Sequence, residues 1–201
     1  MSKKSRLTTA LVALLALGTG IAGTAAYFTS TETVENKFTV GNVTIDVEEP
    51  NWNEDDAKDF VPNKELPKDP TIENTGDNDA YVYFEVVVPT ADGIIVADED
   101  GTRQPQADDV ELWTYEINAG WTQLSRTVND GNVTYVYYAN DALAAGATSA
   151  ALFDTVKMAN VIEGQGLEDS EHTITVKGMA IQTETTGTAQ EAYAKYINQN
   201  K

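Results

Sequence analysis

The sequence predicts an all-β protein, a jelly-roll-like antiparallel β-sandwich with an extended N-terminal arm and a short C-terminal helix. Three features of the chain support this fold. Short runs rich in Val, Ile, Thr, Tyr and Phe recur between clusters of Gly, Pro, Asn and Asp, as expected for strands joined by turns. Apolar and polar residues alternate in several of these runs, which is the spacing of a strand with one buried face. Helical spacing of apolar residues is clear only near the C-terminus.

The composition limits the number of domains and the kind of partner. With 201 residues and 41% hydrophobic content, the chain is long enough for one well-packed domain and short for two. A formal net charge of −19 disfavours binding to nucleic acids and anionic lipids, and favours binding to cations. The chain has no cysteine, which excludes disulfides and thiol chemistry. We therefore expect no nucleic-acid partner.

Residues 1–25 have the features of a secretory signal peptide. The basic stretch 2–6 precedes a glycine-interrupted apolar run, and small residues follow at 23–26. This order predicts export, with cleavage between Ala25 and Ala26 or one residue later. The alternative is a permanent membrane anchor, but a span needs about 20 predominantly apolar residues, and this run is shorter. We therefore expect a secreted protein, located in the extracellular matrix or at the cell surface.

Residues 26–36 predict an extended arm, and residues 37–201 predict the sandwich domain. The arm combines high β-propensity with few apolar residues, so it has little to bury by itself. Its residues alternate between two faces. One face would carry Tyr27, Thr29, Thr31 and Thr33, and the other would carry Phe28, Ser30, Glu32 and Val34.

Alternating or β-branched stretches predict the strands of the domain. They are, in order, 37–47, with a turn or bulge at 41–42, then 71–74, 80–88, 112–117, 121–124, 133–138, 152–158 and 172–183. Turn residues at 75–78, 118–120 and 129–132 predict three hairpins between consecutive strands, and Asp130-Gly131 supplies the positive φ of a tight turn. Apolar residues on both faces at 179–181 predict that the last strand is central in its sheet.

The remaining segments predict a helix and several loops. Residues 188–198 predict a short helix that has Thr188 as its N-cap and an apolar face of Ala192, Tyr193, Tyr196 and Ile197. Residues 92–109 predict a long loop or a small hairpin. We expect Trp113 and Trp121, which lie within strand patterns, to pack in the core or across strands rather than to bind a ligand.

Residues 48–70 contain four prolines and many acids, which predicts a surface loop. Carboxylates are calcium ligands, so the loop is also a weak candidate for a calcium site. The candidate ligands are Glu54, Asp55, Asp56 and Asp59, with Glu48 and Glu49 nearby. Their spacing lacks the pattern of an EF-hand loop, so we interpret the segment as a solvated acidic loop with no cofactor.

The residues required for the common hydrolytic mechanisms are missing. A zinc protease of the usual type needs two histidines four residues apart and a glutamate base, but the only histidine is His172, which is followed by Thr-Ile-Thr. A serine mechanism would have to use the same His172, and no G-x-S-x-G motif is present. The paired acids lie in polar, loop-like sequence, which makes glycoside hydrolysis a weak hypothesis. We therefore predict that the chain is not an enzyme.

Three segments resemble the TasA/camelysin family of exported biofilm-matrix fibre proteins. The first is the AYFT segment after the signal peptide, within TAAYFTSTETVENKFTVGNVTIDV at 24–47. The second is K-D-P-x-I-x-N-T-G-x-x-D-A-Y-V at 68–82, and the third is A-L-A-A-G-x-x-x-x-x-L-F-D-x-V at 142–156. The resemblance implies a SipW-type signal peptide cut by a dedicated signal peptidase, and it implies a sandwich strand at 68–82 rather than a catalytic motif.

Two classes of function follow from these observations. The first is a structural subunit that polymerises by donating its arm as a strand to a neighbouring copy, with an accessory assembly protein as a further candidate partner. The donor strand would consist of Tyr27, Phe28, Thr29, Ser30, Thr31, Glu32, Thr33 and Val34, followed by Phe38. The second is a monomeric cell-surface protein, either a camelysin-like metalloprotease or a calcium-dependent binding module. We favour the first, mainly because of the family resemblance, and also because a head-to-tail fibre needs the arm whereas an enzyme does not.

Overall fold

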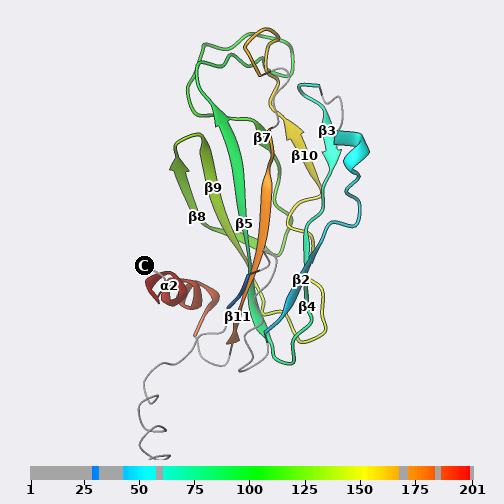
Figure 1. Ribbon diagram of the computed structural model, residues 1–201, viewed down its shortest axis with the longest axis vertical. Helices are drawn as coiled ribbons and strands as arrows, with labels where there is room; N and C mark the ends of the chain where they lie inside the picture. The colour runs from blue at the N-terminus through cyan, green and yellow to red at the C-terminus, as the bar shows by residue number, and fades with distance from the viewer. Residues whose placement is uncertain (1–28, 32–42, 58–60, 168–171, 184–186, 200–201) are drawn as a thin grey trace, which may run out of the picture.

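The computed structural model describes residues 29–31, 43–57, 61–167, 172–183 and 187–199. This part of the chain is mostly β-structure in antiparallel sheets, the largest of which curls into a half-barrel, with one short C-terminal helix (Figure 1). The mostly β, antiparallel character predicted from the sequence is thus confirmed. None of the described helices has the length and apolar character needed to cross a membrane.

The strands and helices have the following bounds. They are β1 (Thr29–Thr31), β2 (Ile45–Glu48), the 3-10 helix η1 (Glu54–Ala57), β3 (Glu65–Pro67), β4 (Thr71–Asn74), β5 (Ala80–Ala91), β6 (Val110–Glu111), β7 (Trp113–Thr114), β8 (Trp121–Asn129), β9 (Asn132–Ala139), β10 (Thr155–Met158), β11 (Thr175–Gln182) and α2 (Ala189–Gln199).

The largest sheet has the strand order β1-β11-β5-β9-β8, and β6 pairs with the end of β5. β11 lies between β1 and β5, which confirms the prediction that this strand is inside its sheet. β8 and β9 form the predicted hairpin, whose turn has Gly131 at a φ of +74°. Only a residue without a Cβ adopts that conformation at little cost, so the Asp-Gly pair fixes the position of this turn.

Two smaller sheets pack against one face of the large sheet. β2 pairs with β4, and β10 lies between β3 and β7. Ile45 of β2, Ile72 of β4 and Leu66 of β3 share one buried cluster with Phe84 of β5 and Ala180 of β11. The main core therefore lies between the large sheet and the two smaller ones.

Two of the three predicted hairpins are wrong. β4 pairs with β2 rather than with β5, because the connection forms a corner instead of a tight turn. At this corner the fully buried Asn74 donates from Nδ2 to the carbonyls of Asn78 and Leu143, and its Oδ1 accepts from Gly76 N. These hydrogen bonds satisfy the turn backbone and direct β5 into the other sheet.

The predicted hairpin between 112–117 and 121–124 also does not form. β7 pairs with β10, whereas β8 pairs with β9, so the connection crosses from one sheet to another. Asn118 N donates to the Leu152 carbonyl, and Trp121 Nε1 donates to the Ala150 carbonyl. The crossing segment is thus held by residues 150–152 rather than by its neighbour in sequence.

The two tryptophans belong to the core, as predicted. Trp113 and Trp121 are 9% and 5% exposed. The Trp121 ring lies 5.0 Å from that of Phe84, and Trp113 Nε1 donates to the His172 carbonyl. Each indole therefore combines apolar packing with a satisfied N–H group.

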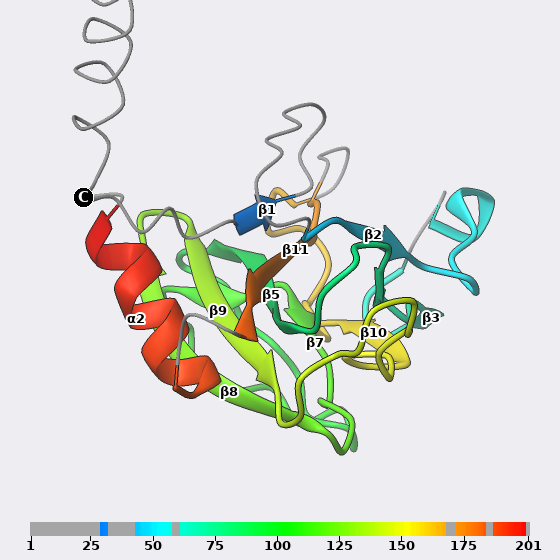
Figure 2. The ribbon, with the colours of Figure 1, turned by 90° about the horizontal axis from the view of Figure 1, so that it is seen from below.

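The C-terminal helix α2 begins with a reciprocal cap. Glu191 N donates to Thr188 Oγ1 at 3.2 Å, and Thr188 N donates to a Glu191 carboxylate oxygen at 3.0 Å. This arrangement satisfies two backbone donors at the helix start and confirms Thr188 as the N-cap. Figure 2 shows α2 on the face of the large sheet opposite to β2 and β3, so the sheet is covered on both sides.

Candidate functional site

The strand β11 has one fully paired side and one partly paired side. On one side it pairs with β5 over all eight residues, Thr175–Gln182. On the other side, which we call the β11 edge, the described residues pair with it only through β1, over three residues. Among the described residues, no other strand pairs with the rest of the β11 edge.

β1 is the described part of the predicted arm. Within the same chain, Thr29 pairs with Ile181, Ser30 with Ala180 and Thr31 with Met179. The sequence predicted an arm but gave no signal for the strand it would join. The other predicted donor residues and the cleavage site lie outside the described residues; they are Tyr27, Phe28, Glu32, Thr33, Val34 and Phe38, together with Ala25 and Ala26.

Side chains of β11 are packed on both faces behind the edge. Ala180 is fully buried in the main core, while Met179 and Ile181 are 3% and 1% exposed in a second cluster on the α2 side. The alternation of strand side chains explains this division. Packing on both faces holds the strand in place, so the β11 edge is a preformed pairing surface.

The opposite edge of the large sheet, at β8, has two features that oppose pairing with another strand. The β8–β9 register shifts between Gln123 and Ser125, which places an irregularity in the edge strand. Arg126 also lies on this strand and forms an ion pair with Glu111 at 2.8 Å. Bulges and charges on edge strands oppose the addition of another strand, so the two edges differ in their capacity to pair.

A tyrosine network lies beside the β8 edge. The Tyr135 hydroxyl donates to both Glu111 carboxylate oxygens, at 2.7 and 2.9 Å, and accepts from Arg126 Nε at 3.1 Å. The hydroxyls of Tyr115 and Tyr137 are 3.0 Å apart. Burial raises the pKa of Tyr137 to about 12 and that of Tyr115 above its usual range. These tyrosines stay protonated near neutral pH and act as structural cross-links.

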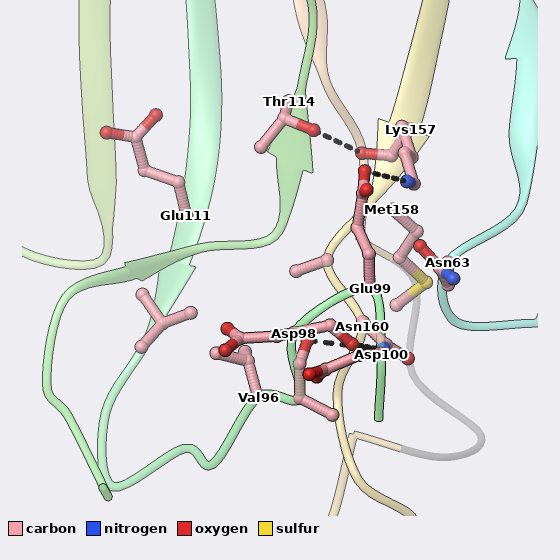
Figure 3. Close-up of a pocket in the computed structure, with 13 residues that line it drawn as sticks. Asn63, Val96, Asp98, Glu99, Asp100, Glu111, Thr114, Lys157, Met158 and Asn160 are labelled. Atoms are coloured by element: carbon pink, nitrogen blue, oxygen red, sulfur yellow. Dashed lines mark hydrogen bonds and ion pairs between the residues drawn. The ribbon is translucent and has the colours of Figure 1, made fainter. Parts of the chain in front are cut away.

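An open hollow of about 680 Å³ lies among β6, β7, β10 and the loop that contains residues 96–100 (Figure 3). Its lining includes Asp98, Glu99, Asp100 and Glu111, and Lys157 Nζ lies 3.9 Å from Glu99. Hydrogen bonds from the Thr102 backbone and side chain lower the pKa of Asp100, which keeps this carboxylate ionised rather than able to donate a proton. The hollow is acidic and lacks a nucleophile next to a base.

Of the four main candidates for metal binding, the structure describes the side chains of Asp55 and Asp56 only. Asp55 and Asp56 are exposed on η1, and Asp59 lies outside the described residues, as does the side chain of Glu54. The His172 ring has Nε2 3.1 Å from the Leu167 carbonyl oxygen. Across the part of the chain that the structure describes, no three His, Cys, Asp or Glu side chains are grouped so as to hold a metal ion.

The acidic loop is instead anchored by a buried cation. Lys68 is 7% exposed, and its Nζ donates to both Glu49 carboxylate oxygens, at 2.6 and 2.7 Å. The same Nζ lies 4.5 Å from the centre of the Trp52 ring. Next to it, Asp69 accepts from the backbone N and from Nδ2 of Asn51. The sequence did not predict this anchor, although Lys68 and Asp69 belong to the K-D-P segment that resembles the fibre proteins.

Comparison with known proteins finds no matching family model, no matching curated protein and no matching solved structure. Function must therefore be inferred from the geometry of this chain and from its sequence motifs. The described feature on which we base the function is the β11 edge.

Proposed function

We propose that this protein is a secreted structural subunit of extracellular biofilm-matrix fibres, which polymerises head-to-tail by donating its N-terminal strand to the β-sandwich of a neighbouring subunit. The observation that carries the proposal is that β11 pairs on one side with β5 and on the other with β1, which is the described part of the N-terminal arm. An arm from a second copy could replace β1 and extend the pairing.

The register of β1 predicts which residues would meet in such a complex. A donated arm in this register would continue so that Val34 lies opposite Val176 and Phe28 lies opposite Gln182. Val176 packs against the main core, and opposite residues of an antiparallel pair share a face. Val34 would thus be added to the core of the acceptor, and Phe28 would cover the end of the strand.

A donated arm must form more contacts than β1 does. Exchange of one β1 for another preserves the existing contacts, but it turns a pairing within one chain into an association of two molecules, which loses translational and rotational entropy. Each additional backbone hydrogen bond contributes about 1 kcal/mol, and each buried valine or aromatic side chain contributes about 1.5–3 kcal/mol. Ordering the added residues costs about 1–2 kcal/mol each. Polymerisation therefore depends on the anchors Phe28, Val34 and Phe38.

The two edges of the sheet support linear growth. Each chain has one arm and one β11 edge, and these are different surfaces, so repeated donation gives an open filament when the rotation between successive copies does not close a ring. The irregular, charged β8 edge opposes a second addition. Copies of the same chain are the main partner in this proposal.

Sequence motifs provide the rest of the support. The AYFT segment and the K-D-P segment resemble the TasA/camelysin family of biofilm-matrix fibre proteins. A dedicated signal peptidase would release the arm, and an accessory assembly protein is a further candidate partner. Mature protein is expected to begin at Ala26 or Tyr27 in the extracellular matrix or at the cell surface.

Deletion of residues 26–35 tests the proposal. We expect the shortened protein to remain folded and monomeric by size-exclusion chromatography, while protein that begins at Ala26 forms fibres visible by negative-stain microscopy. A matched control is Val128→Asp on the exposed part of β8, which should leave fibres intact. Fibres of normal width from the deletion variant would refute the donated-strand function.

A further inference from the structure

The fully buried Tyr83 connects β11 to the C-terminal helix. In the large sheet it lies opposite Met179 of β11. Its hydroxyl donates to the Ala189 carbonyl of α2 at 2.7 Å, and its ring lies 5.4 Å from that of Tyr193. Burial raises the pKa of Tyr83, so this hydroxyl keeps its proton and remains a donor.

The helix packs against β5 and β9, and its buried residues belong to the same cluster as side chains of β11. Ala189 and Ala192 of α2 form one buried cluster with Tyr83, Met179 and Ile181. Figure 2 shows α2 on this face, away from the main core. A second hydrogen bond, from the Tyr81 hydroxyl to the Gly187 carbonyl at 2.9 Å, fixes the approach to the helix.

The residues under this cover are also the residues that bind the arm. Met179 pairs with Thr31, and Ile181 pairs with Thr29. If α2 moved away, both apolar side chains would lose part of their cover at the point where β11 accepts a strand. The local stability of the β1–β11 pair therefore depends on packing that neither strand supplies.

We infer that α2 is a positioning element for the β11 edge, which acts through Tyr83 to hold Met179–Ile181 extended and so prolongs the pairing of an arm. For β1 of the same chain, this effect of α2 does not depend on the proposed function. Its consequence for fibres, a longer residence time of a donated arm, rests on the proposed function.

The test compares two substitutions in the same helix. Ala192 is fully buried against the sheet, whereas Ala194 is exposed. Ala192→Asp should push α2 away from Tyr83, while Ala194→Asp adds the same charge without this effect. We expect amide hydrogen exchange in β1 and β11 to be at least tenfold faster in Ala192→Asp than in Ala194→Asp, with the β3–β10 pair, which lies in a separate sheet away from α2, unchanged. Equal exchange in the two variants would overturn the inference.

A milder variant covers the case in which Ala192→Asp unfolds the whole domain. Tyr83→Phe removes only the hydroxyl that reaches Ala189, and it should raise exchange in β1 and β11 severalfold; no change there would count against the inference. The exchange readout does not require fibres. Exchange in β1 and β11 that is unchanged by Ala192→Asp and Tyr83→Phe would therefore reject the role of α2. Faster exchange in these variants, together with no fibres from the unsubstituted protein, would reject the donated-strand function alone.

Discussion

Gly178 of β11 lies directly against Val47 of β2. A Cβ atom placed on Gly178 would be 2.5 Å from Val47 Cγ2, and 3.3 Å from Ile45 Cδ1. Real Cβ atoms do not approach so closely, so only a residue without a side chain fits between the sheets here. This contact seats the β2–β4 sheet on the strand that carries the β11 edge.

We expect Gly178→Ala to lower the free energy of unfolding by about 1–3 kcal/mol through overpacking, which outweighs the roughly 0.5–1 kcal/mol that alanine gains over glycine within a strand. Chemical denaturation measures the change. Val47→Ala in the same chain should relieve most of the clash, so the two effects should not add. Additive losses would show that the strain lies elsewhere.

The buried tyrosines predict a loss of stability at high pH. Burial raises the pKa of Tyr137 and of Tyr193 to about 12, against about 10 in an unfolded chain. Between these values the unfolded chain releases protons that the folded chain retains, so the contribution of these tyrosines to stability is fully present below pH 10 and is lost as pH rises toward 12.

Ultraviolet absorbance of tyrosinate, followed together with circular dichroism, measures this effect. The buried tyrosines should ionise late and together with unfolding. The Tyr137→Phe variant provides the control, because its stability should fall less steeply over the same pH range. Full ionisation of all tyrosines near pH 10 with the fold intact would contradict the prediction.

Proline at position 31 should block the arm without unfolding the domain. Thr31 lies opposite Met179 at the middle of the predicted donor strand. Proline removes its backbone donor and fixes its φ. We expect Thr31→Pro, like Phe28→Asp combined with Val34→Asp, to give folded monomers by size-exclusion chromatography, whereas Thr31→Ser should form fibres. Normal fibres from the proline variant would show that this segment is not the donated strand.

Purified protein should show no proteolysis that chelators abolish. His172 lies beside the Leu167 carbonyl, and the described residues supply no further ligands to it. A peptide-cleavage assay with and without a chelator measures this, with His172→Ala as the matched variant. Chelator-sensitive cleavage that disappears in His172→Ala would establish the alternative, a metalloprotease.

Local sequence features were sufficient to predict several elements. Asp130-Gly131 fixed the β8–β9 turn, Thr188 marked the start of α2, and two-sided apolarity at 179–181 placed β11 inside its sheet. Each of these signals depends on residues that are close together in sequence, where turn geometry, capping and side-chain alternation act directly.

The pairing of strands that are far apart in sequence could not be predicted from such local features. β4 joins β2 instead of the adjacent β5 because Asn74 and residues far along the chain satisfy the turn. The Lys68–Glu49 pair joins two segments that each resemble a solvated loop in composition. The partner of β1 was also unpredictable, since a strand edge accepts many sequences through its backbone.

In the proposed fibre, a chain whose own β1 covers the β11 edge would be a latent subunit. The three-residue contact between β1 and β11 must dissociate before the edge can accept a neighbour, and this step involves one molecule only. In the proposed fibre, the elongation rate would rise with protein concentration at first and then reach a plateau set by that dissociation. Even a concentrated pool of secreted chains would therefore assemble no faster than one short strand dissociates.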